Sequence, residues 1–175
     1  QQRIVDASLR DAELSGIGLR GAAKDRFNEI QMALADLSTR FANHVLDATK
    51  AWWLDLTAPD DVLGLPPSLL HLAAQTYAVQ GEPPVAADPE RGPWRITLDF
   101  PSFGPFLQHS KRRDLRERAY RAYVTRASGG DFDNSPLLRD ILALRLEMAR
   151  LLGFEDRAAL SLHSKMAPSV PGVQG

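Results

Sequence analysis

The sequence predicts a mainly α-helical fold with one small antiparallel β element. Apolar residues recur every three or four positions over most of the chain, which is the spacing of one face of an α-helix. Two short segments, 51–57 and 94–100, instead alternate apolar and polar residues, as half-buried strands do. With 175 residues, 44% of them hydrophobic, the chain is long enough to bury a core.

Composition and charge exclude several classes of protein. The chain has no cysteine, which excludes disulfide scaffolds and Cys-ligated zinc sites. Its apolar runs fall short of the roughly 20 residues that span a bilayer, so we expect no membrane partner. A formal net charge of −1 argues against a dedicated nucleic-acid binder. Because the chain begins without Met, inside an expected helix, we expect a piece excised from a longer protein.

The first fifty residues predict two helices separated by a turn. An amphipathic helix over 2–13 is followed by Gly16 and Gly18, which favour a turn. The strongest periodic signal then covers 19–50 and predicts a long helix that forms one wall of a larger helical body or hairpin. Its apolar stripe consists of Phe27, Ile30, Leu34, Leu37, Phe41, Val45, Ala48 and Trp52.

The two predicted strands flank a helix. Segment 51–57 is followed by a turn and then by a helix over 66–79, which has proline in its first turn, where proline is tolerated. Segment 81–93 holds four prolines and two glycines and predicts an exposed Pro-rich loop. The second strand, 94–100, ends at Pro101. The strands can pair antiparallel, and because two strands alone are marginal, we expect a third from outside this chain.

The C-terminal third predicts further helices. Asn134 or Ser135 is a natural N-cap for the longest of them, and Gly153 a natural stop after it. Asp156 is expected to cap a last turn or two. The predicted helical segments are 102–110, 112–127, 136–152 and 156–162.

No catalytic or metal residue follows from the residues themselves. The four histidines are not spaced as metal ligands, and none is followed directly by Glu. The nucleophile-elbow, P-loop and dinucleotide-binding motifs are absent from the sequence. We interpret the histidines as ordinary surface or cap residues; they are His44, His71, His109 and His163.

Segment 111–126 carries seven basic and two acidic side chains, whereas 1–110 carries nine basic and fourteen acidic ones. The favoured interpretation is a solvated helix supported by two sets of i,i+4 ion pairs. The alternatives are an anion-facing surface for nucleic acid and a surface that docks the acidic half of the same protein. The expected ion pairs are Arg113–Glu117–Arg121 and Asp114–Arg118.

Five aromatic residues are compatible with a stacking platform for bases or sugars. Their places on strand faces and helix stripes favour core packing instead. These residues are Trp52, Trp53, Trp94, Tyr120 and Tyr123.

Eleven short strings, in their order and spacing, resemble the N-terminal half of zinc metallopeptidases of the thimet oligopeptidase family, in particular its bacterial oligopeptidase A branch. The resemblance covers roughly residues 3 to 170. The strings are RD at 10–11, LSGIGL at 14–19, RFNEIQ at 26–31, LSTRF at 37–41, NHVLDAT at 43–49, GLP at 64–66, WRITLDFPS at 94–102, AYRAYVTRAS at 119–128, DNSP at 133–136, ILALR at 141–145 and LLGF at 151–154.

The resemblance implies a mainly α fold that is the helical half of a two-part, channel-forming peptidase. Family members hydrolyse short peptides in a narrow channel, with zinc held by an HExxH helix and a downstream glutamate. HExxH is absent here, so the resemblance assigns no catalytic, metal or cofactor-binding residue to 1–175. It implies that 1–175 is an inactive wall of the substrate channel in a cytoplasmic enzyme. The catalytic domain is expected to lie outside this segment and to be its packing partner.

A second interpretation is a stand-alone helical protein-interaction module. It predicts a natural reading frame that stops near Gly175 and has no HExxH beyond it. A third is a nucleic-acid-binding helix at 111–126, which predicts retention on polyanion resin with a steep salt dependence. The acidic excess of 1–110 argues against this last interpretation.

Overall fold

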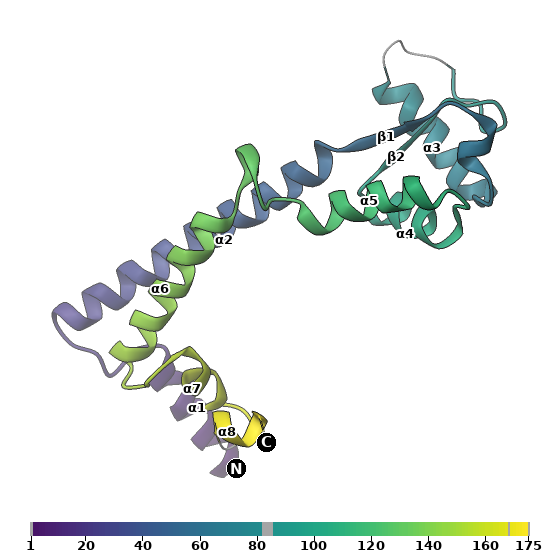
Figure 1. The fold of residues 1–175 in the computed structure, drawn as a ribbon. Coiled ribbons are helices and arrows are strands. Elements are labelled where there is room, and N and C mark those ends of the chain that lie inside the picture. The colour runs from purple at the N-terminus through teal and green to yellow at the C-terminus, as the bar shows by residue number, and fades with distance from the viewer. Residues whose placement is uncertain (1, 82–85, 168, 175) are drawn as a thin grey trace. The chain divides into compact units, whose positions relative to one another are not determined.

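The computed structural model describes residues 2–81, 86–167 and 169–174 and is mainly helical, with a small antiparallel sheet, as predicted (Figure 1). Each helix predicted from periodicity is present, with ends within about three residues of those expected. The elements in order are α1 Gln2–Leu14, α2 Ala22–Lys50, β1 Trp53–Leu56, the 3₁₀ turn η1 Pro59–Val62, α3 Pro67–Gln80, β2 Trp94–Thr97, α4 Phe100–His109, α5 Arg113–Thr125, η2 Gly130–Phe132, α6 Ser135–Leu151, α7 Arg157–Leu162 and α8 Val170–Gln174.

Contacts between residues divide the chain into two compact units. Unit 1 combines Gln1–Phe41 with Ser135–Gly175, and unit 2 is Ala42–Asn134. Helix α2 therefore contributes to both units. That 1–175 acts as one region stays a prediction. The predicted Pro-rich loop at 81–93 lies partly outside the described residues.

Unit 2 is built on the two-stranded sheet. β1 and β2 pair antiparallel as predicted, with Trp53 opposite Thr97 and Leu56 opposite Trp94. Helix α3 contacts β2 and α4, and α4 contacts α5. The inward side chains of these elements form one buried cluster: Leu54, Leu56, Leu65, Leu69, Ala73, Ala74, Trp94, Ile96, Leu98, Phe103, Phe106, Leu115 and Ala119.

The second strand is shorter than the predicted 94–100, and the predicted C-terminal end of this strand is wrong. β2 stops at Thr97 because the next residues turn into α4. The hydroxyl of Ser102 accepts the N–H of Thr97 at 3.0 Å, and the carbonyl of Asp99 accepts the N–H of Ser102 at 2.9 Å. Pro101 lies in the first turn of α4, where proline is tolerated. Phe100, expected on the buried side of a strand, is 78% exposed.

Unit 1 consists of helices with a small core. Part of the predicted apolar stripe of α2 packs there on α6, and Leu37, Leu137 and Ile141 are buried between the two helices. An exposed ion pair joins the same two helices, with Arg26 Nε 2.7 Å and Nη2 2.9 Å from the Glu147 carboxylate oxygens.

The predicted stop at Gly153 and the predicted cap at Asp156 in unit 1 are confirmed. Gly153 has φ +84° after α6, a conformation that glycine reaches without strain. The carboxylate of Asp156 accepts the N–H of Ala159 at 2.8 Å and caps α7. Helix α8 is not among the predicted helices. Ser169 accepts the N–H of Gly172 at 3.2 Å, and Pro171 lies in the first turn of the helix.

The predicted amphipathic helix α1 is present, but its apolar side is not buried. Ile4, Val5 and Leu9 are exposed in the described part of the chain. No described helix is both long enough and apolar enough to cross a bilayer.

Candidate functional site

An open groove of about 900 Å³ runs along the exposed face of the basic helix α5. Counted from Arg113, its lining residues on α5 fall at i+3, i+4, i+7, i+8, i+11 and i+12, which places them on one face of the helix. The opposite face carries Leu115 and Ala119, which are part of the buried cluster of unit 2. The groove is lined by Leu107 of α4 and by Arg113, Arg116, Glu117, Tyr120, Arg121, Val124 and Thr125 of α5.

The three groove arginines differ in what they already bind. Arg121 pairs with Glu117, with its Nε 2.9 Å and Nη2 2.8 Å from Oε1. Arg116 donates from one Nη to the carbonyl of Ser110, which leaves other N–H groups of its guanidinium available. Arg113 is exposed and has no ion-pair or hydrogen-bond partner in the described part of the chain. The groove thus presents one free guanidinium and one that is partly engaged.

Arg112, just before α5, binds two carboxylates. Its Nη1 lies 2.6 Å from Oδ1 of Asp61, and its Nε and Nη2 lie 3.0 and 2.7 Å from the Asp114 oxygens. Hydrogen bonding from Arg112 lowers the pKa of Asp114 to about 2, and the Asp114 bond raises the pKa of Arg112. The predicted Glu117–Arg121 pair is confirmed. The predicted Arg113–Glu117 and Asp114–Arg118 pairs are wrong, because Arg113 has no described partner and Asp114 binds Arg112 instead.

A second polar site, on the sheet of unit 2, is missed by sequence reasoning. The alternation of β2 predicts an outward, solvated Arg95, whereas its side chain is only 7% exposed. The guanidinium lies 2.7 Å from both Asp55 oxygens and donates to the carbonyl of Gln80 at 2.7 Å. Its carbon lies 4.8 Å from the ring centre of Trp53 and 5.3 Å from that of Tyr77. Opposite charges on two strands are a signal for such a pair, but the strand register that aligns Asp55 with Arg95 is set by tertiary structure.

The predicted core packing of the aromatic residues is confirmed for only part of the set. Trp94 is buried, Trp52 and Tyr123 are half-buried, and Tyr123 stacks on Phe103 with ring centres 4.2 Å apart. Trp53 and Tyr120 are 51% and 55% exposed, so core packing is wrong for these two. Tyr120 lines the α5 groove instead.

Each described contact of a histidine is with a different neighbour, and no two histidines contact each other in the described residues. Nδ1 of His44 lies 3.0 Å from Oδ1 of Asn134, and Nδ1 of His71 lies 2.9 Å from the carbonyl of Pro67. His109 is exposed at the end of α4, and the rings of His163 and Phe154 pack edge to face with their centres 5.1 Å apart. Over the described ranges, no three His, Asp or Glu side chains lie close enough together to hold a metal ion. These residues therefore do not fit a zinc site. The absence of zinc from this segment stays a prediction.

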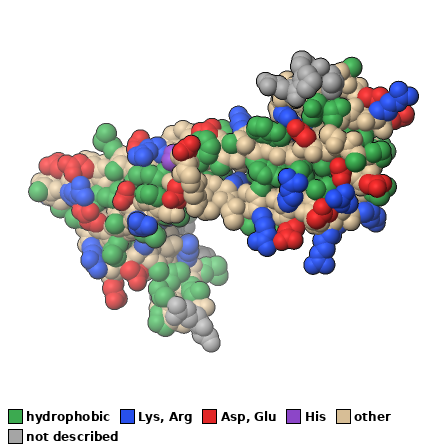
Figure 2. Space-filling view, turned by 45° about the horizontal axis from the view of Figure 1, so that its top comes forward, with side chains coloured by type: hydrophobic (Ala, Val, Ile, Leu, Met, Phe, Trp, Pro, Cys, Tyr) green, Lys and Arg blue, Asp and Glu red, His purple; other side chains and the backbone are tan. Residues whose placement is uncertain are grey.

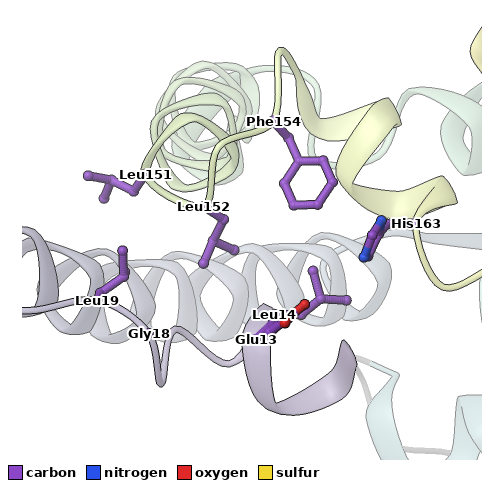
Figure 3. Close-up of a pocket in the computed structure, with 8 residues that line it drawn as sticks. All are labelled: Glu13, Leu14, Gly18, Leu19, Leu151, Leu152, Phe154 and His163. Atoms are coloured by element: carbon purple, nitrogen blue, oxygen red, sulfur yellow. The ribbon is translucent and has the colours of Figure 1, made fainter. Parts of the chain in front are cut away.

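Unit 1 contains a smaller open pocket of about 300 Å³ (Figure 3). Its lining is mostly apolar, and the ring of Phe154 projects from the loop after α6 toward it. One carboxylate and one imidazole also line the pocket, too few groups for a metal site. The lining residues are Glu13, Leu14, Gly18, Leu19, Leu151, Leu152, Phe154 and His163.

Comparison with known proteins matches this chain to a peptidase family. Residues 106–175 match the model of peptidase family M3. The chain is 47% identical, over 95% of its length, to the probable cytosolic oligopeptidase A of Arabidopsis thaliana and also to the organellar oligopeptidase A of that plant. It is 43% identical, over 95% of its length, to oligopeptidase A of Escherichia coli K12. The predicted resemblance to this family is confirmed.

The M3-like chain spans about a quarter of the length of these relatives: 24% of the cytosolic plant protein, 21% of the organellar one and 24% of the bacterial one. All residues that line the α5 groove lie within the part that matches the M3 model. Residues 1–105, which include α1 to α3 and the sheet, precede that match.

Proposed function

We propose that this chain is part of a zinc-dependent oligopeptidase that hydrolyses short peptides. The observation that carries the proposal is the 42–47% identity, over 95% of the chain, to several proteins named oligopeptidase A. When bound in such an enzyme, zinc acts as a Lewis acid and lowers the pKa of a bound water. HExxH is absent from this sequence, so the proposal places the zinc ligands and the general base elsewhere in the parent.

The role proposed for this segment is that of a channel wall that packs against the catalytic half. Its long helices suit a wall, and exposed apolar residues support a covering partner, because large apolar patches on soluble proteins are usually interaction surfaces. On α1 these residues are Ile4, Val5 and Leu9. A narrow channel would admit short, unstructured peptides and exclude folded proteins.

The experiment that tests the proposal compares the full-length parent with residues 1–175 alone. We expect the parent to cleave a short unstructured peptide, to lose that activity with a chelator and to regain it with zinc. We expect no cleavage by the isolated segment. Cleavage by the isolated segment that persists in a chelator would contradict the proposal, as would a parent that cleaves folded proteins as readily as peptides.

The stand-alone interaction module remains the alternative, and the gene distinguishes the two. A reading frame that continues past residue 175 into an HExxH motif supports the peptidase parent. A cytoplasmic location is also a proposal. The two plant relatives are equally identical to this chain, and one is named cytosolic, the other chloroplastic or mitochondrial.

A further inference from the structure

We infer that the α5 groove binds an acidic side chain of a peptide substrate, an inference that rests on the proposed peptidase function and names a substrate preference. The groove combines cationic and apolar lining along one helix face. In the space-filling view, Lys and Arg side chains are interspersed with hydrophobic ones over unit 2 (Figure 2).

The cationic end of the groove suits a carboxylate. Arg113 and Arg116 are three positions apart and line the same groove, so both guanidinium groups lie on the same face of α5. Arg113 has no partner in the described ranges, and Arg116 engages the Ser110 carbonyl. Planar guanidinium groups bind carboxylates through paired N–H donors, which gives both strength and orientation.

The other end of the groove suits the apolar body of a peptide. Tyr120 and Val124 are four positions apart, line the groove and are both exposed. An exposed tyrosine beside an exposed valine offers a contact surface for an apolar residue next to the acidic one. The expected ligand is therefore a short peptide with Glu or Asp adjacent to an apolar residue.

The same groove is poorly suited to nucleic acid. Unit 2 carries ten basic and twelve acidic side chains, so its overall field does not attract a polyanion. Three other arginines of unit 2 pair with carboxylates inside the chain: Arg95 with Asp55, Arg112 with Asp61 and Asp114, and Arg121 with Glu117.

The experiment uses the full-length parent and two short amidated peptides that differ at one position, Glu in one and Gln in the other. Amidation removes the C-terminal carboxylate, so the difference between the peptides reports the side chain alone. We compare the wild type with Arg113→Gln and with Arg118→Gln. Arg118 is a matched control, because it is exposed on the same helix and does not line the groove.

We expect the wild type to favour the Glu peptide through a lower KM, and Arg113→Gln to reduce this Glu-to-Gln preference about two- to fivefold, the range for an exposed ion pair. Arg118→Gln should keep the wild-type preference. A preference that is unchanged in Arg113→Gln, as expected if the rest of the parent covers the groove, would overturn the inference. Displacement of the Glu peptide by a single-stranded oligonucleotide, with the same dependence on Arg113, would assign the groove to nucleic acid and overturn it as well.

A binding measurement separates this inference from the proposed function. If the parent cleaves neither peptide, the peptidase proposal fails. Fluorescence anisotropy of the labelled Glu and Gln peptides then still tests the groove. Tighter binding of the Glu peptide that is lost in Arg113→Gln supports the groove, and equal binding of both peptides overturns it.

Discussion

Unit 2 packs a sheet and three helices around one cluster of thirteen buried residues, whereas the buried cluster described in unit 1 has three. The two units also differ in sequence continuity. Unit 2 is a single segment, and unit 1 joins residues from both ends of the chain. Unit 1 leaves the apolar side of α1 exposed, while most inward residues of unit 2 are covered by its own helices. Unit 2 therefore has the larger connected core, whereas unit 1 buries Phe27 and Ile30 outside its three-residue cluster.

The largest expected effect comes from the core of unit 2. Phe106→Ala removes a fully buried ring and should cost about 3–5 kcal/mol of unfolding free energy, whereas Ile141→Ala in unit 1 should cost about 2 kcal/mol, because its half-exposed neighbours can relax. The chain's three tryptophans all lie in unit 2, so urea unfolding followed by Trp fluorescence reports that unit alone. Circular dichroism reports both units. Equal losses of unfolding free energy in the two variants would contradict the difference between the two cores.

A second effect is expected at the sheet. Asp55→Ala removes the carboxylate that lies 2.7 Å from the nearly buried Arg95 guanidinium. Removing one partner of a buried pair costs about 3–5 kcal/mol, and we expect about 2 kcal/mol here, because the Asp55 side chain is 32% exposed. Glu117→Ala, which removes an exposed pair with Arg121, should change stability by less than about 1 kcal/mol. Urea unfolding of unit 2 measures both, and equal losses would show that Arg95 does not depend on Asp55.

A third effect probes the turn that precedes α2 in unit 1. Gly16 has φ +74°, and a Cβ placed there would lie 2.9 Å from a ring carbon of Phe27. Gly16→Ala should therefore destabilise unit 1 by about 1–2 kcal/mol through backbone strain and overlap. Gly18→Ala is the control, because nothing lies within 4 Å of its added Cβ. Circular dichroism during urea unfolding should distinguish the two variants. A Gly16→Ala variant as stable as the wild type would show that this turn tolerates a side chain at residue 16.

The smallest effect concerns pH and occurs in both units. Arg112 lowers the pKa of Asp114 in unit 2 to about 2, and Arg26 lowers the pKa of Glu147 in unit 1. A folded pKa below the unfolded one means that each pair stabilises the chain above the ordinary carboxyl pKa, and that this contribution is lost as pH falls through the folded pKa.

Carboxyl NMR titration measures these two pKa values directly. Arg112→Gln should raise the pKa of Asp114 toward its ordinary value of about 3.9 and leave that of Glu147 unchanged. Arg26→Gln should raise the pKa of Glu147 and leave that of Asp114 unchanged. A pKa of Asp114 that stays low in Arg112→Gln would contradict the assigned cause.

Sequence reasoning predicted the local features of both units well. Leu34 and Leu37 in the stripe of α2 face the core of unit 1, and Leu54 and Leu56 in the alternation of β1 face that of unit 2. It could not predict the α5 groove as a cavity, although it singled out the basic segment that forms it. A groove depends on which side chains of α4 and α5 lie next to each other, and spacing within one helix does not contain that information.

The sequence by itself determined the helix periods, the two strands, the cap at Asp156 and the resemblance to an oligopeptidase, because these depend on neighbouring residues or on the order of strings along the chain. Tertiary structure alone decided that Asp55 meets Arg95, that Asp114 binds Arg112 and that Tyr120 is exposed. Each of these depends on strand register, on the path of a turn or on what covers a helix face. Strand register and the cover of a helix face are set by contacts between segments far apart in the chain. The turn before α5 brings Arg112 to the distant Asp61 as well as to Asp114, and helical spacing does not predict that turn.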